Sequence, residues 1–231
     1  LELIAARKGP YTVFSRAQAL NELMTTFSNR IAVAGTHGKT TTSALIAKML
    51  DGVGEDPTFL VGSEIIDFAT NARLGKSSYF VAEADESDGS FLNLSPNIGV
   101  ILNLEEEHMD YYQSLDHIID YYSKFNHLVI DNGGYLILNG DDSNIKKTVS
   151  GIDRNKRFFF SIDSQSDFYA TNIVFSLNGT SFDLVIRGKE TFKVKTHLHG
   201  KHNVYNTLAA LSLGILEKQS CINIIKSLSC F

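Results

Sequence analysis

Residues 30–42, which read Arg-Ile-Ala-Val-Ala-Gly-Thr-His-Gly-Lys-Thr-Thr-Thr, constrain the fold of this chain more than any other stretch. Residues 31–34 are apolar and predict a short buried strand, and residues 43–50 show the apolar spacing of a helix. A strand, a glycine turn and Lys-Thr at the start of a helix follow one another in phosphate-binding loops. The stretch therefore predicts an α/β fold that binds an anion where the strand gives way to the helix.

The chemistry of this loop favours phosphate. Glycines let backbone N–H groups approach an anion closely, and the helix N-terminus adds partial positive charge. Lys39 offers a full charge to the β/γ-phosphates, and the Thr40 hydroxyl can bind Mg²⁺. The pattern departs from the usual one at Val33, where a glycine is common, so an ordinary strand-to-helix turn is the alternative. The predicted nucleotide contacts in the loop are Gly35, Thr36, His37, Gly38, Lys39, Thr40 and Thr41.

Apolar runs alternate with helical patterns as far as about residue 156. Helices are expected over residues 17–27 and 114–128. Strands are expected over residues 31–34, 58–63, 78–83, 97–103 and 135–139. Continuous apolar strands that alternate with helices indicate a parallel sheet covered on both faces.

The pattern changes after residue 156. Four runs with partial alternation follow, at residues 157–161, 169–175, 181–186 and 191–198. Short turns such as Asn178-Gly179 separate them, which predicts an antiparallel subsheet. A helix over residues 202–218 and a shorter one complete the chain. The predicted fold class is α/β, a mostly parallel phosphate-loop sheet flanked by helices, with a smaller antiparallel subsheet.

Charge and cysteine content exclude several functions. The net charge of −5 argues against a general nucleic-acid or membrane-surface role. No apolar stretch approaches the roughly 18 residues of a membrane span. Cys221 and Cys230 are too few for a metal site or a disulfide framework, which fits a reducing compartment. We therefore expect a cytoplasmic protein that binds neither nucleic acid nor membranes.

Three of the predicted parallel strands are followed by residues suited to metal binding. Thr40 lies in the phosphate loop, Glu83 ends a second strand, and His108 follows a third by a short loop. Ligands of parallel sheets bind beyond the carboxyl ends of the strands, so these side chains should converge. Carboxylate and hydroxyl oxygens suit Mg²⁺, and an imidazole would also tolerate Mn²⁺. The alternatives are a solvated loop carboxylate and a structural histidine.

Two further clusters allow both a structural and a functional interpretation. Asp85, Glu86 and Asp88 are interpreted as helix-capping or loop residues, Glu86 in particular. Asn203 and Asn206 follow His202 and share one face of the late helix. Their spacing alone leaves helix capping and recognition of a base edge equally open.

Together these motifs resemble the Mur ligases, the ATP-dependent amide-forming enzymes of peptidoglycan assembly. The resemblance covers nearly the whole chain in order: the phosphate loop, residues 83–88, residues 103–110 and the His202-Asn203-x-x-Asn206 segment. Residues 83–88, followed by Ser90-Phe91-Leu92, are similar to the branch that adds L-alanine to UDP-N-acetylmuramate. The murein tripeptide-recycling branch is much alike and stays open.

The resemblance implies a role for each matching residue. Lys39 would hold the γ-phosphate, Thr40 and Glu83 would bind Mg²⁺, and His108 would bind a second Mg²⁺. Lys39, Glu83 and His108 would be the catalytic set, and ATP the nucleotide. Further implied positions are His202, Asn203 and Asn206 around the adenine, Arg73 facing the sugar nucleotide, and Lys124 as the nearest candidate for the carbamylated lysine of several family members.

The resemblance also implies a division of the chain. Residues 1–28 would be the end of an N-terminal UDP-binding domain and a linker, and residues 29–231 the central ATP-binding domain. The arginine and aspartate expected in a C-terminal domain are absent, so the isolated chain is expected to be inactive. The implied substrates are UDP-N-acetylmuramate, L-alanine and ATP. A folylpolyglutamate-type ligase and a nucleotide module that only binds are the other readings.

Overall fold

The computed structural model describes residues 2–229 and 231, so the expectation for Cys230 lies outside the described residues. Its strands form one sheet in the order β10-β9-β8-β7-β6-β5-β1-β4-β2-β3. The strands are β1 (Asn29–Ala34), β2 (Thr58–Ile65), β3 (Thr70–Arg73), β4 (Tyr79–Glu83), β5 (Ile98–Ile101), β6 (Tyr135–Asn139), β7 (Arg157–Ser161), β8 (Phe168–Ser176), β9 (Gly179–Ile186) and β10 (Glu190–Thr196). In this spatial order, the strands from β8 through β7, β6, β5, β1 and β4 to β2 pair parallel with one another. At one end of the sheet β9 and β10 pair antiparallel, and at the other end β3 pairs antiparallel with β2. The predicted α/β class is confirmed.

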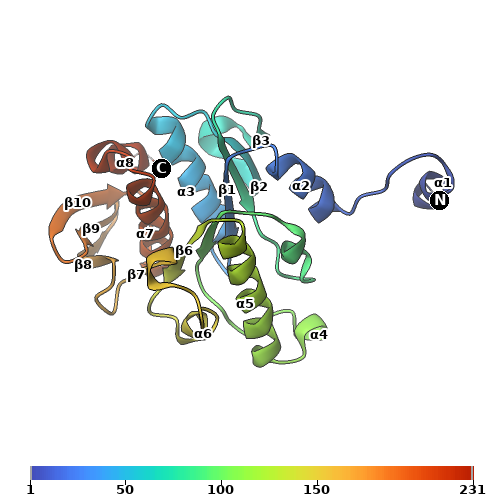
Figure 1. Ribbon diagram of the computed structural model, residues 1–231. Helices are drawn as coiled ribbons and strands as arrows, with labels where there is room; N and C mark the ends of the chain where they lie inside the picture. Colours follow the sequence, from blue (N-terminus) through green and yellow to red (C-terminus); the bar gives the residue numbers. More distant parts are fainter. Residues whose placement is uncertain (1, 230) are drawn as a thin grey trace.

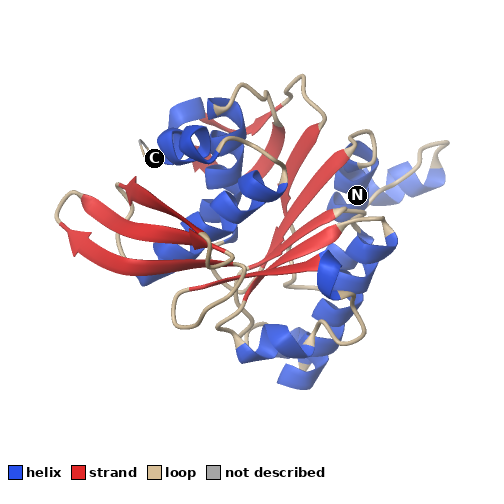
Figure 2. Cartoon of the chain, turned by 60° about the vertical axis from the view of Figure 1, so that its left-hand side comes forward, coloured by secondary structure: helices blue, strands red, loops and turns tan. Residues whose placement is uncertain are grey.

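Helices cover both faces of this sheet (Figures 1 and 2). The α-helices are α1 (Glu2–Lys8), α2 (Arg16–Met24), α3 (Lys39–Gly52), α4 (Met109–Tyr112), α5 (Leu115–Asp131), α6 (Ser143–Lys147), α7 (Lys201–Leu216) and α8 (Cys221–Leu228). Short 3₁₀ turns occupy η1 (Ile66–Phe68), η2 (Ser90–Asn93) and η3 (Arg154–Lys156). No α-helix in this described part of the chain has the length and apolar character to span a membrane.

Alternation along the central strand β1 creates two cores. Ile31 and Val33 pack toward α3, α7 and α8, whereas Ala32 and Ala34 pack toward α2, α5 and α6. Successive side chains of a strand point to opposite faces, so a strand buried on both faces is apolar throughout. This explains why residues 31–34 show no polar alternation in the sequence.

The partial alternation at residues 157–161 predicts a strand of the antiparallel subsheet, and this prediction is wrong. β7 pairs parallel with β6 and with β8, and the antiparallel part begins only at the β8–β9 hairpin. The segment between β6 and β7 contains α6 and η3 and crosses back over the sheet. A crossover of this kind joins parallel neighbours, whereas two-residue turns join antiparallel ones.

The shortest elements of the fold have no recognisable pattern in the sequence. The strand β3 adds an antiparallel edge beside β2, and α1, α4 and α6 were not expected. The helix α1 buries no residue, and Figure 1 shows it away from the sheet, joined to α2 by an extended segment. Elements of four to seven residues contain too few positions for an apolar period to be recognised.

The antiparallel end of the sheet is covered unequally. Phe168, Phe182, Leu184 and Val194 face the core formed with α7 and α8. Among the described residues, β8, β9 and β10 contribute no buried residue to the core on the opposite face. On the face that α2, α5 and α6 cover, the sheet therefore has no buried core over β8, β9 and β10.

A substitution at Phe125 tests the core between the sheet and the helices α2, α5 and α6. Phe125 is fully buried on α5 and stacks on Phe91 at a centroid separation of 5.0 Å. We expect Phe125→Ala to lower the free energy of unfolding by about 3–5 kcal/mol because the cavity collapses only partly. The matched change Phe175→Ala, at a side chain 54% exposed on β8, should cost less than about 1 kcal/mol. Urea unfolding measures both, and equal losses would contradict this core assignment.

Candidate nucleotide site

The phosphate loop leaves β1 at Ala34 and enters α3 at Lys39. Gly38 has φ +87° and is the N-cap of α3, a left-handed conformation that suits glycine. A Cβ on Gly38 would lie 2.6 Å from Oδ1 of Asn206, which is a clash. The backbone angle therefore favours glycine at this position, and any larger residue would have to displace the Asn206 amide.

Asn103, just beyond β5, fastens this loop from the neighbouring strand. The backbone N–H of His37 donates to Asn103 Oδ1 at 2.7 Å, and Asn103 Nδ2 donates back to the His37 carbonyl at 2.9 Å. The Thr36 N–H donates to the Asn103 carbonyl at 3.2 Å. The sequence identified Asn103 only as a polar residue at a strand end, because its partner is 66 residues away.

Lys39 is held inside its own loop. Its Nζ donates to the carbonyls of Gly35 at 2.7 Å and Thr36 at 3.3 Å, and lies 2.7 Å from Glu86 Oε1. Glu86 is only 4% exposed, so its interpretation as a capping residue is wrong. Burial raises the pKa of the Glu86 carboxyl, and the hydrogen bond from Lys39 opposes part of that rise.

The neighbouring acids behave as expected for loop residues. Asp85 accepts the Ser87 N–H at 3.1 Å, and Asp88 accepts the Ser90 N–H at 2.9 Å. These are local side-chain to backbone bonds that stabilise turns. Spacing in the sequence could not separate Glu86 from these two acids, because its partner Lys39 lies 47 residues away.

Glu83 lies beside the phosphate loop, as predicted, because β4 and β5 flank β1 on its two sides. Its Oε2 accepts the Thr40 hydroxyl at 3.1 Å, and its Oε1 accepts the Gly62 N–H. A Cβ on Gly62 would sit 3.1–3.2 Å from both carboxylate oxygens, so glycine leaves this carboxylate open. One carboxylate and one hydroxyl beside a phosphate loop fit Mg²⁺, which binds through few protein oxygens and keeps waters and substrate phosphates.

The Glu107 carboxylate lies between His108 and the loop residue His37. His108 Nε2 and His37 Nε2 each lie 3.9 Å from a different oxygen of the Glu107 carboxylate. No hydrogen bond or ion pair in the described structure joins His108 to Thr40 or Glu83, and no three His, Cys, Asp or Glu side chains described here form a ready metal site. A metal role for His108 therefore stays a prediction.

A cavity of about 570 Å³ opens beside the loop. His37 and Gly38 line one side, and His202, Tyr205 and Asn206 from the first turns of α7 line another. Asn203 does not line the cavity. Its Oδ1 instead accepts from Asn206 Nδ2 at 3.1 Å, while its Nδ2 donates to the His199 carbonyl at 2.8 Å. The volume is within the range of small-molecule sites.

Asp141 organises the far wall of this cavity and was not identified from the sequence. It accepts the N–H groups of Ile162 at 2.6 Å and Asp163 at 2.9 Å, the Ser164 hydroxyl at 2.7 Å and the Tyr205 hydroxyl at 2.9 Å. Burial by itself would raise the pKa of Asp141, but these hydrogen bonds outweigh it and lower that pKa. The partners come from distant segments, so no sequence pattern marks them.

Arg73 and Lys124 are both engaged in ion pairs away from the loop. Arg73 Nη2 lies 2.9 Å from Asp51 and 3.3 Å from Asp56, and its guanidinium covers the ring of Phe68 at 4.5 Å. Lys124 Nζ lies 2.7 Å from Asp120 on the surface of α5. These contacts give each side chain a structural role.

The model of the Mur ligase middle domain matches residues 33–214. The chain belongs to the Mur ligase family. A Mur ligase middle domain binds ATP. The match begins within β1 and ends within α7, so it contains the phosphate loop, Glu83, Asn103, His108 and the cavity-lining turns of α7.

Curated relatives of this chain carry the name of one enzyme within the Mur ligase family. The UDP-N-acetylmuramate–L-alanine ligase of Dictyoglomus turgidum is 41% identical over 212 residues, which are 92% of this chain and 45% of the relative. The enzyme of that name from Clostridium botulinum is 37% identical over 231 residues, which are 100% of this chain and 50% of the relative. The chain thus spans about half the length of these relatives.

Solved structures agree with the fold. The UDP-N-acetylmuramate–alanine ligase of Thermotoga maritima superposes with a TM-score of 0.83 at 23% identity, over 99% of this chain and 51% of that one. The UDP-N-acetylmuramate:L-alanyl-γ-D-glutamyl-meso-diaminopimelate ligase from Neisseria meningitides superposes with a TM-score of 0.85 at 28% identity, over 100% and 74%. Both share the whole architecture described here.

The lowered pKa of Asp141 predicts a pH-dependent stability. A carboxyl whose pKa falls on folding stabilises the folded state above its unfolded pKa of about 4, and this contribution disappears as the pH falls through the folded pKa. Asp141→Asn should therefore destabilise the chain at pH 7, and the difference from the parent should shrink toward pH 2. Asp131→Asn, an exposed acid at the end of α5, should show little difference at either pH. Urea unfolding across this range would refute the idea if the Asp141 difference stayed constant.

Proposed function

We propose that this chain is the central ATP-binding part of a ligase that joins L-alanine to UDP-N-acetylmuramate. The observation that carries the proposal is the phosphate loop, with Lys39 poised within it, Glu83 against Thr40, and a nucleoside-sized cavity at its side. The curated relatives at 37–41% identity carry that enzyme name. We propose residues 29–231 as the ATP-binding domain, and residues 1–28 as the end of a UDP-binding domain and linker.

In this proposal the chain contributes electrostatics and positioning. ATP phosphorylates the muramate carboxylate, the amine of L-alanine attacks the acyl phosphate, and inorganic phosphate leaves. Lys39 moves from Glu86 onto the phosphates, where its charge and the loop N–H groups offset the charge that develops during phosphoryl transfer. Thr40 and Glu83 would hold one Mg²⁺ and His108 a second, and these ions neutralise phosphate charge when bound. No protein nucleophile is required.

The cavity beside the loop would hold the adenosine. His202 is exposed at its edge, and its ring forms no hydrogen bond or ion pair with another described residue, so the ring is available to a base. Asn206 is 4% exposed and touches Gly38, so it would support the loop as well as the base. Asn203 would orient the Asn206 amide by accepting a hydrogen bond from its Nδ2.

A tripeptide-adding ligase is the second candidate. The Neisseria meningitides enzyme that carries that name matches the full chain at 28% identity. Among the solved structures, the L-alanine ligase of Thermotoga maritima is less similar in sequence, at 23% identity. The curated relatives at 37–41% identity carry the L-alanine ligase name, and they favour L-alanine as the amino acid added.

Two substitutions separate the phosphate and base contacts. Lys39→Ala removes a charge-assisted contact worth about 1.5–3 kcal/mol, so it should weaken both ATP and inorganic triphosphate about tenfold to a hundredfold. His202→Ala should weaken ATP and leave triphosphate unchanged. Lys193→Ala, an exposed lysine on β10, is the matched control and should alter neither. Calorimetry decides, and undiminished ATP binding by Lys39→Ala would overturn the site.

Domain exchange tests the ligase assignment. We expect this chain, placed in the corresponding segment of the Dictyoglomus turgidum ligase, to support more L-alanine addition than it supports tripeptide addition in the Neisseria meningitides enzyme. The domain contacts of the first enzyme should match better at 41% identity than those of the second at 28%. Lys39→Ala should abolish activity in both chimeras. The reverse ranking would favour the tripeptide ligase.

A further inference from the structure

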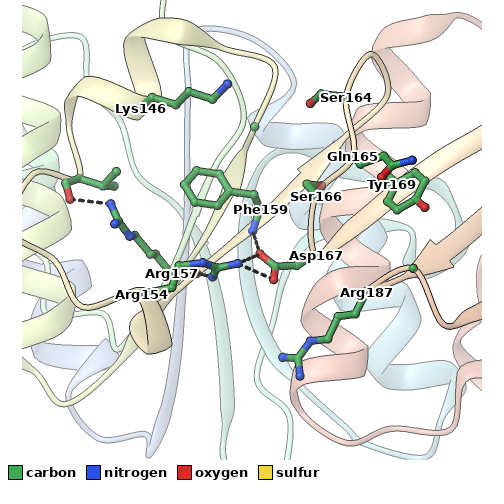
Figure 3. A pocket seen from close by; sticks show the side chains of 13 residues that line it. Lys146, Arg154, Arg157, Phe159, Ser164, Gln165, Ser166, Asp167, Tyr169 and Arg187 are labelled. Atoms are coloured by element: carbon green, nitrogen blue, oxygen red, sulfur yellow. Dashed lines mark hydrogen bonds and ion pairs between the residues drawn. The ribbon is translucent and has the colours of Figure 1, made fainter.

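A second cavity, of about 740 Å³, lies on the face of the sheet that carries no buried core beyond α6. Figure 3 shows side chains from α6, β7, the loop before β8 and the β9–β10 turn around it. None of its lining residues lines the nucleotide cavity. The segment of residues 162–166 separates the two cavities, since Asp163 lines the nucleotide cavity and Ser164 lines the second cavity. The cavity is therefore separate from the phosphate loop.

Positive charge dominates this second cavity. Lys146, Arg154, Arg157 and Arg187 line it, against the single carboxylate of Asp167. Asp167 is already matched, since Arg154 donates to its two oxygens at 2.7 and 2.9 Å (Figure 3). In a chain of net charge −5, this local excess of cations is not a general property of the surface.

The other three cations have no carboxylate partner among the described residues. Arg157 donates through Nη1 to the Val149 carbonyl at 3.0 Å, and its Nε is buried without a hydrogen-bond partner. The Arg187 guanidinium lies over the Phe158 ring at 5.9 Å, and Phe158 packs on the opposite face of the sheet from Phe159, so this cation is turned away from the cavity. The Lys146 side chain forms no hydrogen bond or ion pair within the described structure. Lys146 and Arg157 thus line the cavity without a carboxylate counter-charge, which a bound anion would supply.

We propose that this cavity binds the phosphate group of a phosphorylated small molecule. Guanidinium forks pair with the oxygens of a phosphate in a bidentate manner, and a phosphate offers three oxygens to cations that come from separate segments. Phe159 and Tyr169 line the same cavity and supply an apolar wall for the organic part of the ligand. The volume is within the range of small-molecule sites.

Inorganic pyrophosphate is the probe, because both phosphate sites accept it. At low ionic strength, calorimetry should show two sites on the parent chain. Lys39→Ala should weaken the phosphate-loop site and leave the other unchanged. The double variant Lys146→Ala/Arg157→Gln should weaken the second site at least tenfold and leave ATP binding unchanged, which also shows that the variant folds.

The matched control removes the same charge elsewhere. Lys193→Ala/Lys195→Ala lies on exposed positions of β10 outside both cavities and should change neither site by more than about twofold. A parent chain with no pyrophosphate site that survives Lys39→Ala, or equal weakening of the second site by the control, would overturn the proposal. Citrate that binds the second site as tightly as pyrophosphate would also overturn it, because phosphate would then not be selected. If the parent instead shows the second site and no site that depends on Lys39, that result would contradict the proposed ATP site.

Discussion

The candidate site depends on a loop whose shape is fixed by hydrogen bonds within the protein itself. Asn103 exchanges two hydrogen bonds with the backbone of His37, and its carbonyl accepts the Thr36 N–H. Lys39 closes the loop from within through the Gly35 and Thr36 carbonyls. A loop fixed before its ligand arrives loses less conformational entropy on binding, so more of the contact energy is available for affinity.

Glu86 complements this arrangement electrostatically. A lysine at a helix N-terminus concentrates positive charge, and the buried Glu86 carboxylate balances it at 2.7 Å. Its second oxygen is buried with no hydrogen-bond partner in the described structure. A carboxylate held this way is costly to bury, which is why its pKa rises. Phosphate oxygens would compete with it for Lys39 and thereby exchange one anionic partner for another.

The parallel sheet brings the remaining groups to the same edge. β1 lies between β4 and β5, so the carboxyl ends of these strands place Glu83 and Asn103 on either side of the loop. Side chains 43 and 66 residues apart from their loop partners thus become neighbours. The late helix α7 adds Asn206 against Gly38 and forms one wall of the cavity beside the loop. The same sheet continues into β8–β10, whose open face carries the second, basic cavity.

The sequence by itself determined the local features: the phosphate loop, the long amphipathic and buried helices, the apolar strands, and the class of the fold. Those features depend on residues within one turn or one strand of each other, so their periodicity and glycine positions are readable along the chain. Only the tertiary structure decided that Glu86 pairs with Lys39 rather than capping a helix, that β7 is parallel, and that Asn103 and Asp141 hold the walls of the site. These outcomes depend on partners 20 to 70 residues away, and which distant segments meet is set by the order of the strands in the sheet, a property that no local pattern encodes.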